Sequence, residues 1–120
     1  MKAGDENILL ISSEKRGLIE KFVPGAETLG ALSEYFFALS DGTRLKILSA
    51  LAITPLCVGD ISTVLGINQT TVSHQLRTLR LAGIVSCRRQ GKIGFYRIAD
   101  KSVLDVMLSA TDGIMKSEAV

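Results

Sequence analysis

The sequence predicts a mainly α-helical fold that carries one small β-hairpin. Apolar residues recur at helical spacing in several consecutive segments. Two short β-prone segments near residues 84–98 are joined by a turn that contains glycine. The chain has 120 residues, of which 47% are apolar and 22% are charged, and this is enough for one domain with a real core.

Residues 1–26 are expected to form an N-terminal extension with a short helix. That helix begins at Ser13 and ends before Pro24-Gly25. Its apolar face comprises Leu18, Ile19, Phe22 and Val23. The main domain is expected over residues 27–116, where the first helix covers about 26–38. This helix has a stripe made of Leu29, Leu32, Phe36 and Leu39.

The next predicted helix begins after Asp41, because a short carboxylate can accept hydrogen bonds from the free N–H groups of a first helical turn. Its core face is expected to consist of Leu45, Leu48 and Leu51. Thr54-Pro55 ends it, since the residue before a proline disfavours the helical conformation.

The pattern of apolar, capping and glycine residues over about residues 60–82 is typical of a helix-turn-helix. A short apolar face follows Asp60, and Gly66 stands where a helix can end in a left-handed conformation. Asn68 is a favourable N-cap for a second helix, which Gly83 closes. Val72, Leu76 and Leu79 recur at helical spacing in this second helix and predict its buried side.

Residues of about 84–98 then read as two strands with Gln90-Gly91-Lys92 at the tip. A hairpin that follows a helix-turn-helix is the wing of a winged helix, so we expect a winged helix-turn-helix. Asp100 caps a last helix over about 100–115. Its apolar band is wider than a small monomer needs and comprises Val103, Leu104, Met107, Leu108, Thr111 and Ile114. The band favours a dimeric protein; alternatively, this helix closes the monomer core.

The charge distribution points to nucleic acid. Residues 61–99 contain no Asp or Glu, yet they hold six of the 14 basic residues: Arg77, Arg80, Arg88, Arg89, Lys92 and Arg97. A basic segment beside an acidic remainder predicts a surface for a polyanion. We expect the polyanion to be double-stranded DNA, although a solvated basic surface has the same composition.

The outer side of the second helix carries hydrogen-bonding side chains and no carboxylate, as a helix in the major groove requires. Gln69 and Arg77 are predicted to contact base edges. Thr70, Thr71 and Ser73 are placed for phosphates or thymine methyl groups. His74 is predicted to donate a hydrogen bond to a phosphate or between two helices, rather than to bind a metal. From the wing, Arg88, Arg89 and Lys92 are expected to hold the adjacent backbone or minor groove.

Three segments resemble the ArsR/SmtB family of winged-helix repressors. They are the run from Ala38 to Leu48, the run from Thr71 to Leu79, and Arg89-Gln90-Gly91-Lys92 with Tyr96. The resemblance covers roughly residues 29–115, and Gly42 departs from it, because the family usually has proline there. The resemblance implies a homodimer on a palindromic operator, paired mainly by its first and last helices. It also implies repression that a metal, metalloid or thiol-reactive signal relieves.

The family's known effector sites are incomplete in this chain. Soft-metal sensors of the family carry Leu-Cys-Val-Cys-Asp where this chain has Leu56-Cys57-Val58-Gly59-Asp60. Zinc and nickel sensors use carboxylates and histidines on the last helix. Here Asp100 and Asp112 lie near those positions, but Ser102 and Gly113 stand where histidines are expected.

Cys57 and Cys87 remain as possible sensor thiols. They are either two buried small apolar residues, or a dithiol redox switch, or ligands of a soft metal or metalloid shared across the dimer. Whether the two sulfur atoms can meet depends on the strand order. Two cysteines do not make a disulfide scaffold.

The remaining function classes are less well supported. The longest early apolar run, Ile8 to Ile11, is too short for a membrane span or a signal peptide, so we expect a cytoplasmic protein without a membrane partner. One histidine and no grouping of residues at catalytic spacing argue against an enzyme. The alternative is a winged-helix protein–protein interaction module without an effector.

Overall fold

The computed structural model describes residues 8–119, with side chains characterised for residues 8–117. It divides into two compact units, one up to residue 32 and one from residue 33. The first unit contains α2 (Ser13–Phe22), and the division falls within α3 (Ala26–Leu39). Helix α2 begins at Ser13 as expected, and its N-cap is Ser12, whose side chain accepts a hydrogen bond from the Lys15 amide.

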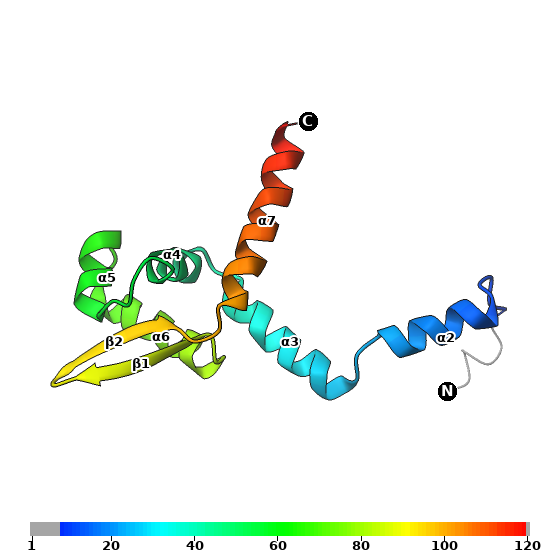
Figure 1. Cartoon of the computed structure of the whole chain (residues 1–120), viewed down its shortest axis with the longest axis horizontal. Helices are drawn as coiled ribbons and strands as arrows, with labels where there is room; N and C mark the ends of the chain where they lie inside the picture. Colours follow the sequence, from blue (N-terminus) through cyan, green and yellow to red (C-terminus); the bar gives the residue numbers. More distant parts are fainter. Residues whose placement is uncertain (1–7, 120) are drawn as a thin grey trace. The chain divides into compact units, whose positions relative to one another are not determined.

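The second unit combines helices with one hairpin, as the sequence predicts (Figure 1). It contains the rest of α3 and then α4 (Gly42–Leu51), α5 (Val58–Leu65), α6 (Gln69–Leu81), β1 (Val85–Gln90), β2 (Ile93–Ile98) and α7 (Ser102–Ala119). Helix α5 begins two residues before the expected start near residue 60, and α7 continues beyond the expected end near residue 115.

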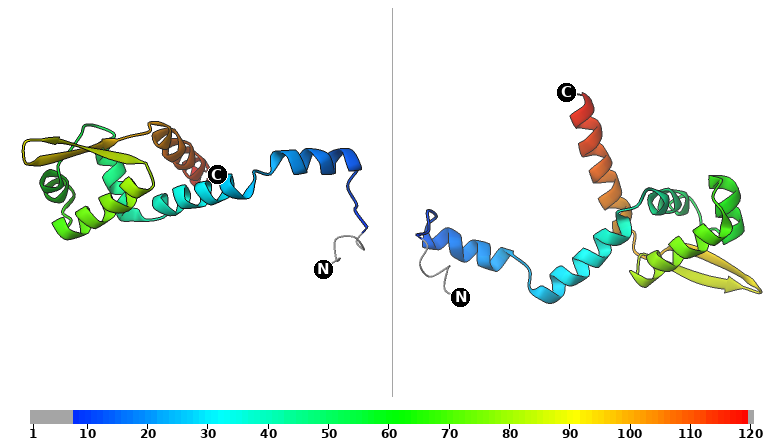
Figure 2. Two further views of the ribbon diagram at one scale, coloured as in Figure 1. Left: turned by 90° about the horizontal axis from the view of Figure 1, so that it is seen from below. Right: turned by 180° about the vertical axis from the view of Figure 1, so that it is seen from behind.

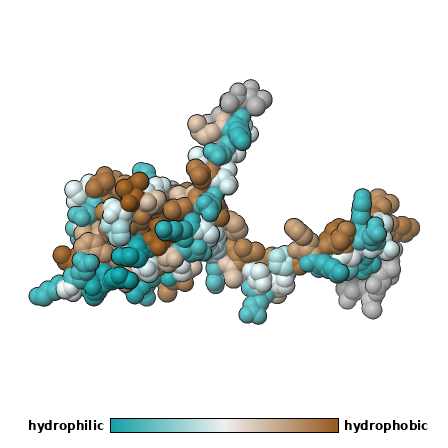
Figure 3. Space-filling model, viewed as in Figure 1, coloured by the Kyte–Doolittle hydropathy of each residue, from teal (hydrophilic) through white to brown (hydrophobic). Residues whose placement is uncertain are grey.

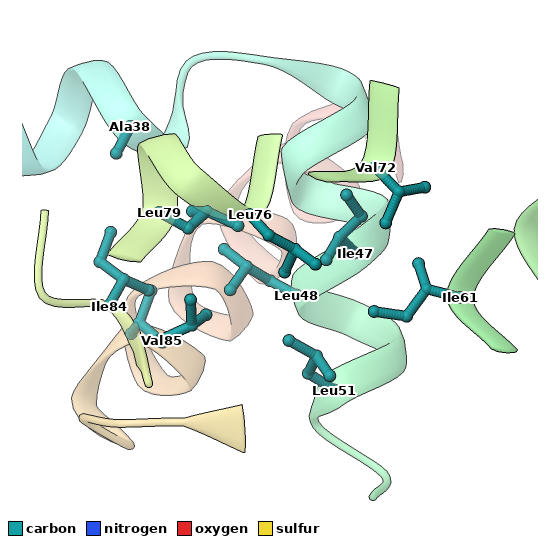
Figure 4. Packing of buried hydrophobic residues seen from close by; sticks show 11 residues of the cluster. Ala38, Ile47, Leu48, Leu51, Ile61, Val72, Leu76, Leu79, Ile84 and Val85 are labelled. Carbon is teal, nitrogen blue, oxygen red and sulfur yellow. The ribbon is translucent and has the colours of Figure 1, made fainter. Parts of the chain in front are cut away.

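The core lies among α4, α5, α6 and the start of β1 (Figure 4). Its fully buried side chains include Ile47, Leu48, Ile61, Val72, Leu76, Leu79 and Ile84. Val103 anchors the first turn of α7 to this cluster. The predicted core face of α4 is wrong in one position: Leu45 is only half-buried, whereas Ile47 is fully buried. Both spacings are helical, and Ile47 lies beside Leu76 of α6 in the core (Figure 4).

Two predicted caps are confirmed. The Asp41 carboxylate accepts a hydrogen bond from the Arg44 amide at 3.1 Å, and the Asn68 side chain accepts one from the Thr71 amide at 3.1 Å. Gly66 ends α5 in the left-handed region, with φ of 66°. These three residues fix where α4, α5 and α6 begin or end.

The hairpin is an antiparallel ladder from Val85 opposite Ile98 to Gln90 opposite Ile93. The two strands lie side by side in every view, and their tip projects from the helices of the second unit (Figure 2). Its base is attached to the helical part by Leu56, which exchanges two backbone hydrogen bonds of 3.0 and 2.8 Å with Tyr96 on the outer edge of β2. The wing is therefore held at its base and free at its tip.

Candidate DNA-binding surface

Helix α6 has a buried side and an exposed side. Val72, Leu76 and Leu79 are fully buried, and this fixes the rotation of the helix about its axis. The predicted contact residues of α6 are all exposed, namely Gln69, Thr70, Thr71, Ser73, His74 and Arg77. The exposed side therefore presents amide, hydroxyl, imidazole and guanidinium groups, which can bond to base edges and phosphates.

The hairpin adds further cations. Arg88, Arg89 and Lys92 are exposed, and the tip is hydrophilic in Figure 3. Arg89 donates a hydrogen bond of 3.1 Å from Nη1 to the Lys92 carbonyl, which ties the two sides of the tip together. Gly91 makes this turn with φ of 65°, a conformation that favours glycine.

A shallow hollow of about 790 Å³ joins α6 to the hairpin. From α6 it is lined by Thr70, Ser73, His74, Arg77, Arg80 and Leu81, and from β2 by Tyr96. No carboxylate lines it. Arg80 and Tyr96 are additions to the residues predicted from the sequence. Arg80 lies three residues after Arg77, so helical spacing alone could have placed it on the same side.

The two cysteines line a second hollow of about 600 Å³, which Tyr96 also lines. Cys57 and Cys87 are free thiols and half-buried. Arg80, Arg89 and Lys92 line the same hollow. Within residues 8–119, no three or more His, Cys, Asp or Glu side chains gather closely enough to hold a metal ion. Tyr96 and Arg80 belong to both hollows, so the thiols lie next to the predicted DNA-binding surface.

The chain shows extensive sequence similarity to known regulators. The family model for bacterial regulatory proteins of the arsR family matches residues 41–86, from the N-cap of α4 to the start of β1. The transcriptional repressor SmtB homolog of Synechocystis is 33% identical over 109 residues, which cover 91% of this chain and 83% of that protein. The chain belongs to the ArsR family.

Two further comparisons agree with this assignment. The cadmium resistance transcriptional regulatory protein CadC homolog of Staphylococcus aureus is 36% identical over 80 residues, which cover 66% of each chain. A homodimeric winged helix-turn-helix DNA-binding domain from Mycobacterium bovis, a possible ArsR-family regulator, has a TM-score of 0.64. It is 32% identical, and 93% of each chain is covered.

This ArsR-family protein is a DNA-binding transcriptional regulator, and its predicted winged helix-turn-helix fold is confirmed. The family consists of regulatory proteins and not of enzymes. None of the helices between residues 8 and 119 has both the length and the apolar character needed to cross a membrane.

Proposed function

We propose that this protein is a homodimeric repressor that inserts α6 into the major groove of a palindromic operator. The observation that carries the proposal is the continuous surface of α6 and the wing, which combines exposed hydrogen-bonding groups with cations and no carboxylate. Gln69 and Arg77 contact base edges, and Thr70, Thr71 and Ser73 contact phosphates or thymine methyl groups. His74 donates a hydrogen bond to a phosphate, and the wing holds the neighbouring backbone or minor groove.

Dimer formation is supported by unpartnered apolar side chains on α7. Leu108 and Ile114 are 63% and 61% exposed. Ile114 also lines an apolar hollow of about 340 Å³, together with Phe36 and Leu39 of α3, Leu45 of α4 and Met107 of α7 among others. The Mycobacterium bovis domain is homodimeric, and a two-fold axis would place one α6 in each half-site of the operator.

Operator binding tests this function. Arg77→Ala is expected to weaken binding by about 1–3 kcal/mol and to relax the base preference at one position, because Arg77 lies on the exposed side of α6. Lys46→Ala is the matched control, since Lys46 is exposed on α4 and lies outside both hollows. Fluorescence anisotropy over single-base variants of the operator measures both effects. Unchanged affinity and preference in Arg77→Ala would refute the placement of α6.

Salt dependence separates a repressor from a protein–protein module. The logarithm of the DNA affinity should fall steeply with the logarithm of the salt concentration, because each neutralised phosphate releases counterions. Lys92→Ala should lower that slope by about one, since Lys92 contributes one exposed charge at the wing tip. An affinity that does not depend on salt would favour the protein–protein module.

We further propose that a metal, metalloid or thiol-reactive signal at Cys57 and Cys87 relieves repression. Support comes from the hollow that both thiols line beside the DNA-binding surface. The DNA-bound protein can be titrated with zinc, cadmium, arsenite and a persulfide, with and without reductant. The double variant Cys57→Ser/Cys87→Ser is expected to bind the operator normally and to respond to none of them. A response that persists in this variant would exclude the thiols as the sensor.

A further inference from the structure

The hollow that holds the two thiols is positively charged. Arg80 from α6, Arg89 from β1 and Lys92 from the tip of the wing all line it, and no carboxylate does. Its volume of about 600 Å³ is in the range of small-molecule sites. Three cations around a concave surface raise the local concentration of small anions. The hollow therefore favours an anionic ligand of low molecular weight.

The hairpin register places Cys87 on the face that lines this hollow. Cys87 and Arg89 alternate along β1, and Gly94 and Tyr96 alternate along β2, so the four residues share one face of the hairpin. Arg88 lies on the opposite face. An ideal Cβ at position 94 would lie 2.9 Å from the Cys87 sulfur, which therefore occupies the space that a side chain would otherwise fill. Gly94 keeps this sulfur uncovered on the hairpin face.

The ladder also sets the spacing between Cys87 and Leu56, the residue before Cys57. Leu56 pairs with one edge of Tyr96, and Cys87 pairs with the other edge. Two strand spacings put the Cα atoms of Leu56 and Cys87 about 9.5 Å apart, with Cys57 one residue further on. A disulfide needs Cα atoms closer than about 7 Å. Leu56 itself lies beyond that limit, and Cys57 and Cys87 are both free thiols in this structure.

We propose that Cys87 is a reaction site for anionic disulfides of low molecular weight. The thiol proton leaves to solvent, and the Cys87 sulfur attacks one sulfur of the bound disulfide. The disulfide bond breaks, a new bond forms between Cys87 and the attacked sulfur, and the other sulfur departs with the electron pair as a thiolate that solvent protonates.

The adduct brings negative charge to the wing. Arg89 and Lys92 line the hollow and are also proposed to hold the DNA backbone, so an anionic group bound to Cys87 neutralises cations that the DNA needs. This consequence rests on the proposed function, whereas the reaction at Cys87 does not. The inference specifies the signal as a charged disulfide that acts directly at the DNA-binding surface.

The test compares oxidised glutathione, which is anionic, with cystamine, which is dicationic. Intact-protein and peptide mass spectrometry gives the rate of adduct formation at each cysteine in the folded protein and in the urea-unfolded chain. The ratio of the glutathione rate to the cystamine rate at Cys87 is expected to be about tenfold higher in the folded protein, because only the fold assembles the three cations. Equal glutathione-to-cystamine rate ratios at Cys87 in the folded protein and the unfolded chain, or an adduct mainly at Cys57, would overturn the proposal.

Variants test the geometry. Arg80→Ala is expected to lower the folded-state ratio, whereas Lys46→Ala leaves it unchanged. Gly94→Ala is expected to slow the reaction at Cys87 but not at Cys57, because the added methyl group contacts the Cys87 sulfur. Unaltered Cys87 kinetics in both Arg80→Ala and Gly94→Ala would contradict the assigned site.

Operator affinity is then measured on purified glutathione-modified and unmodified protein. The modified form is expected to bind about tenfold more weakly at moderate salt. Equal affinity would refute the effect on DNA. Failure of the unmodified protein to bind any duplex would refute the proposed function alone, because the rate ratio at Cys87 is measured without DNA.

Discussion

At the scale of single residues, Arg44 connects three helices from inside the core. Its side chain is 9% exposed and donates three hydrogen bonds: Nε to the Ala38 carbonyl at 2.7 Å, Nη2 to the Phe37 carbonyl at 3.1 Å, and Nη1 to the Gln75 side chain at 2.7 Å. The guanidinium also lies 5.6 Å from the centre of the Phe37 ring. It thus satisfies carbonyls at the end of α3 and fixes α6 through Gln75.

Arg44→Ala is expected to lower the free energy of unfolding by about 2 kcal/mol, because the buried Ala38 carbonyl and the Gln75 side-chain oxygen lose their donor, whereas the Phe37 carbonyl keeps its hydrogen bonds from Ser40. Lys46→Ala, two residues away and exposed, is expected to change it by less than about 0.5 kcal/mol. Urea denaturation followed by circular dichroism measures both. Equal stabilities of the two variants would show that the Arg44 hydrogen bonds contribute nothing net.

The sequence alone does not predict this role for Arg44. Arginine is usually exposed, and the three acceptors lie six, seven and 31 residues away in the chain. In contrast, the caps at Asp41 and Asn68 could be predicted because each depends on a partner only three residues away. Cys87 shows the same limit, because the non-local pairing of Leu56 with Tyr96 is what places Cys57 on the same hollow as Cys87.

At the scale of elements, the junction between α5 and α6 depends on Gly66. Its φ of 66° is rare for residues that have a Cβ atom, and it lets the chain turn directly from α5 into α6. Gly59 on α5 has no such requirement, because its φ is not in the left-handed region and an added Cβ would meet nothing within 4 Å.

Replacing each of the two glycines with alanine is therefore expected to change the stability of the protein in opposite directions. Gly66→Ala is expected to destabilise the protein by about 1 kcal/mol, owing to the left-handed backbone. Gly59→Ala is expected to stabilise it by about 0.5–1 kcal/mol, since alanine has the higher helix propensity. Thermal unfolding monitored at one protein concentration compares them. A Gly66→Ala variant as stable as the wild type would contradict the role of this glycine in the turn.

The start of α7 predicts a dependence on pH. The backbone hydrogen bond from Ser102 holds the pKa of the Asp100 carboxyl below its ordinary value of 3.8. The charged form is thus favoured by folding, and its contribution is present above the ordinary pKa and is lost as pH falls through the lowered pKa. Asp100→Asn keeps an oxygen acceptor, so its stability should fall less between about pH 4 and pH 2 than that of the wild type. Urea titrations of the wild type and Asp100→Asn at each pH test this. Identical dependence of stability on pH in the two proteins would show that Asp100 does not contribute to it.

At the scale of the whole molecule, apolar side chains remain exposed along α7 although the core is already closed by its first turn. Val103 is fully buried, whereas Leu108, Ile114 and Met115 are mostly exposed. Both expectations for this helix thus find support in different parts of it: the first turn packs on the core, and the later turns offer an apolar surface. Helical periodicity predicted the apolar band of α7. It could not show which of its residues pack on the monomer core and which stay exposed, because spacing carries no information about tertiary contacts.

Ile114→Lys is expected to shift the protein toward monomer and to weaken operator binding, because a charge would replace an apolar side chain at the proposed interface. Val64→Lys is the control, since Val64 on α5 is 71% exposed and lies away from α7. Sedimentation velocity gives the oligomeric state, and anisotropy gives the DNA affinity. Unchanged sedimentation of Ile114→Lys would place the dimer contact elsewhere.

All three acceptors of the Arg44 hydrogen bonds are neutral groups. Two carbonyl groups and one amide have no proton to gain in mild acid, unlike a carboxylate that would release its cation on protonation. The hydrogen bonds from Arg44 to α3 and α6 should therefore persist at acidities that neutralise ordinary ion pairs. Acidification should loosen the start of α7 before it alters how α3 and α6 are held together.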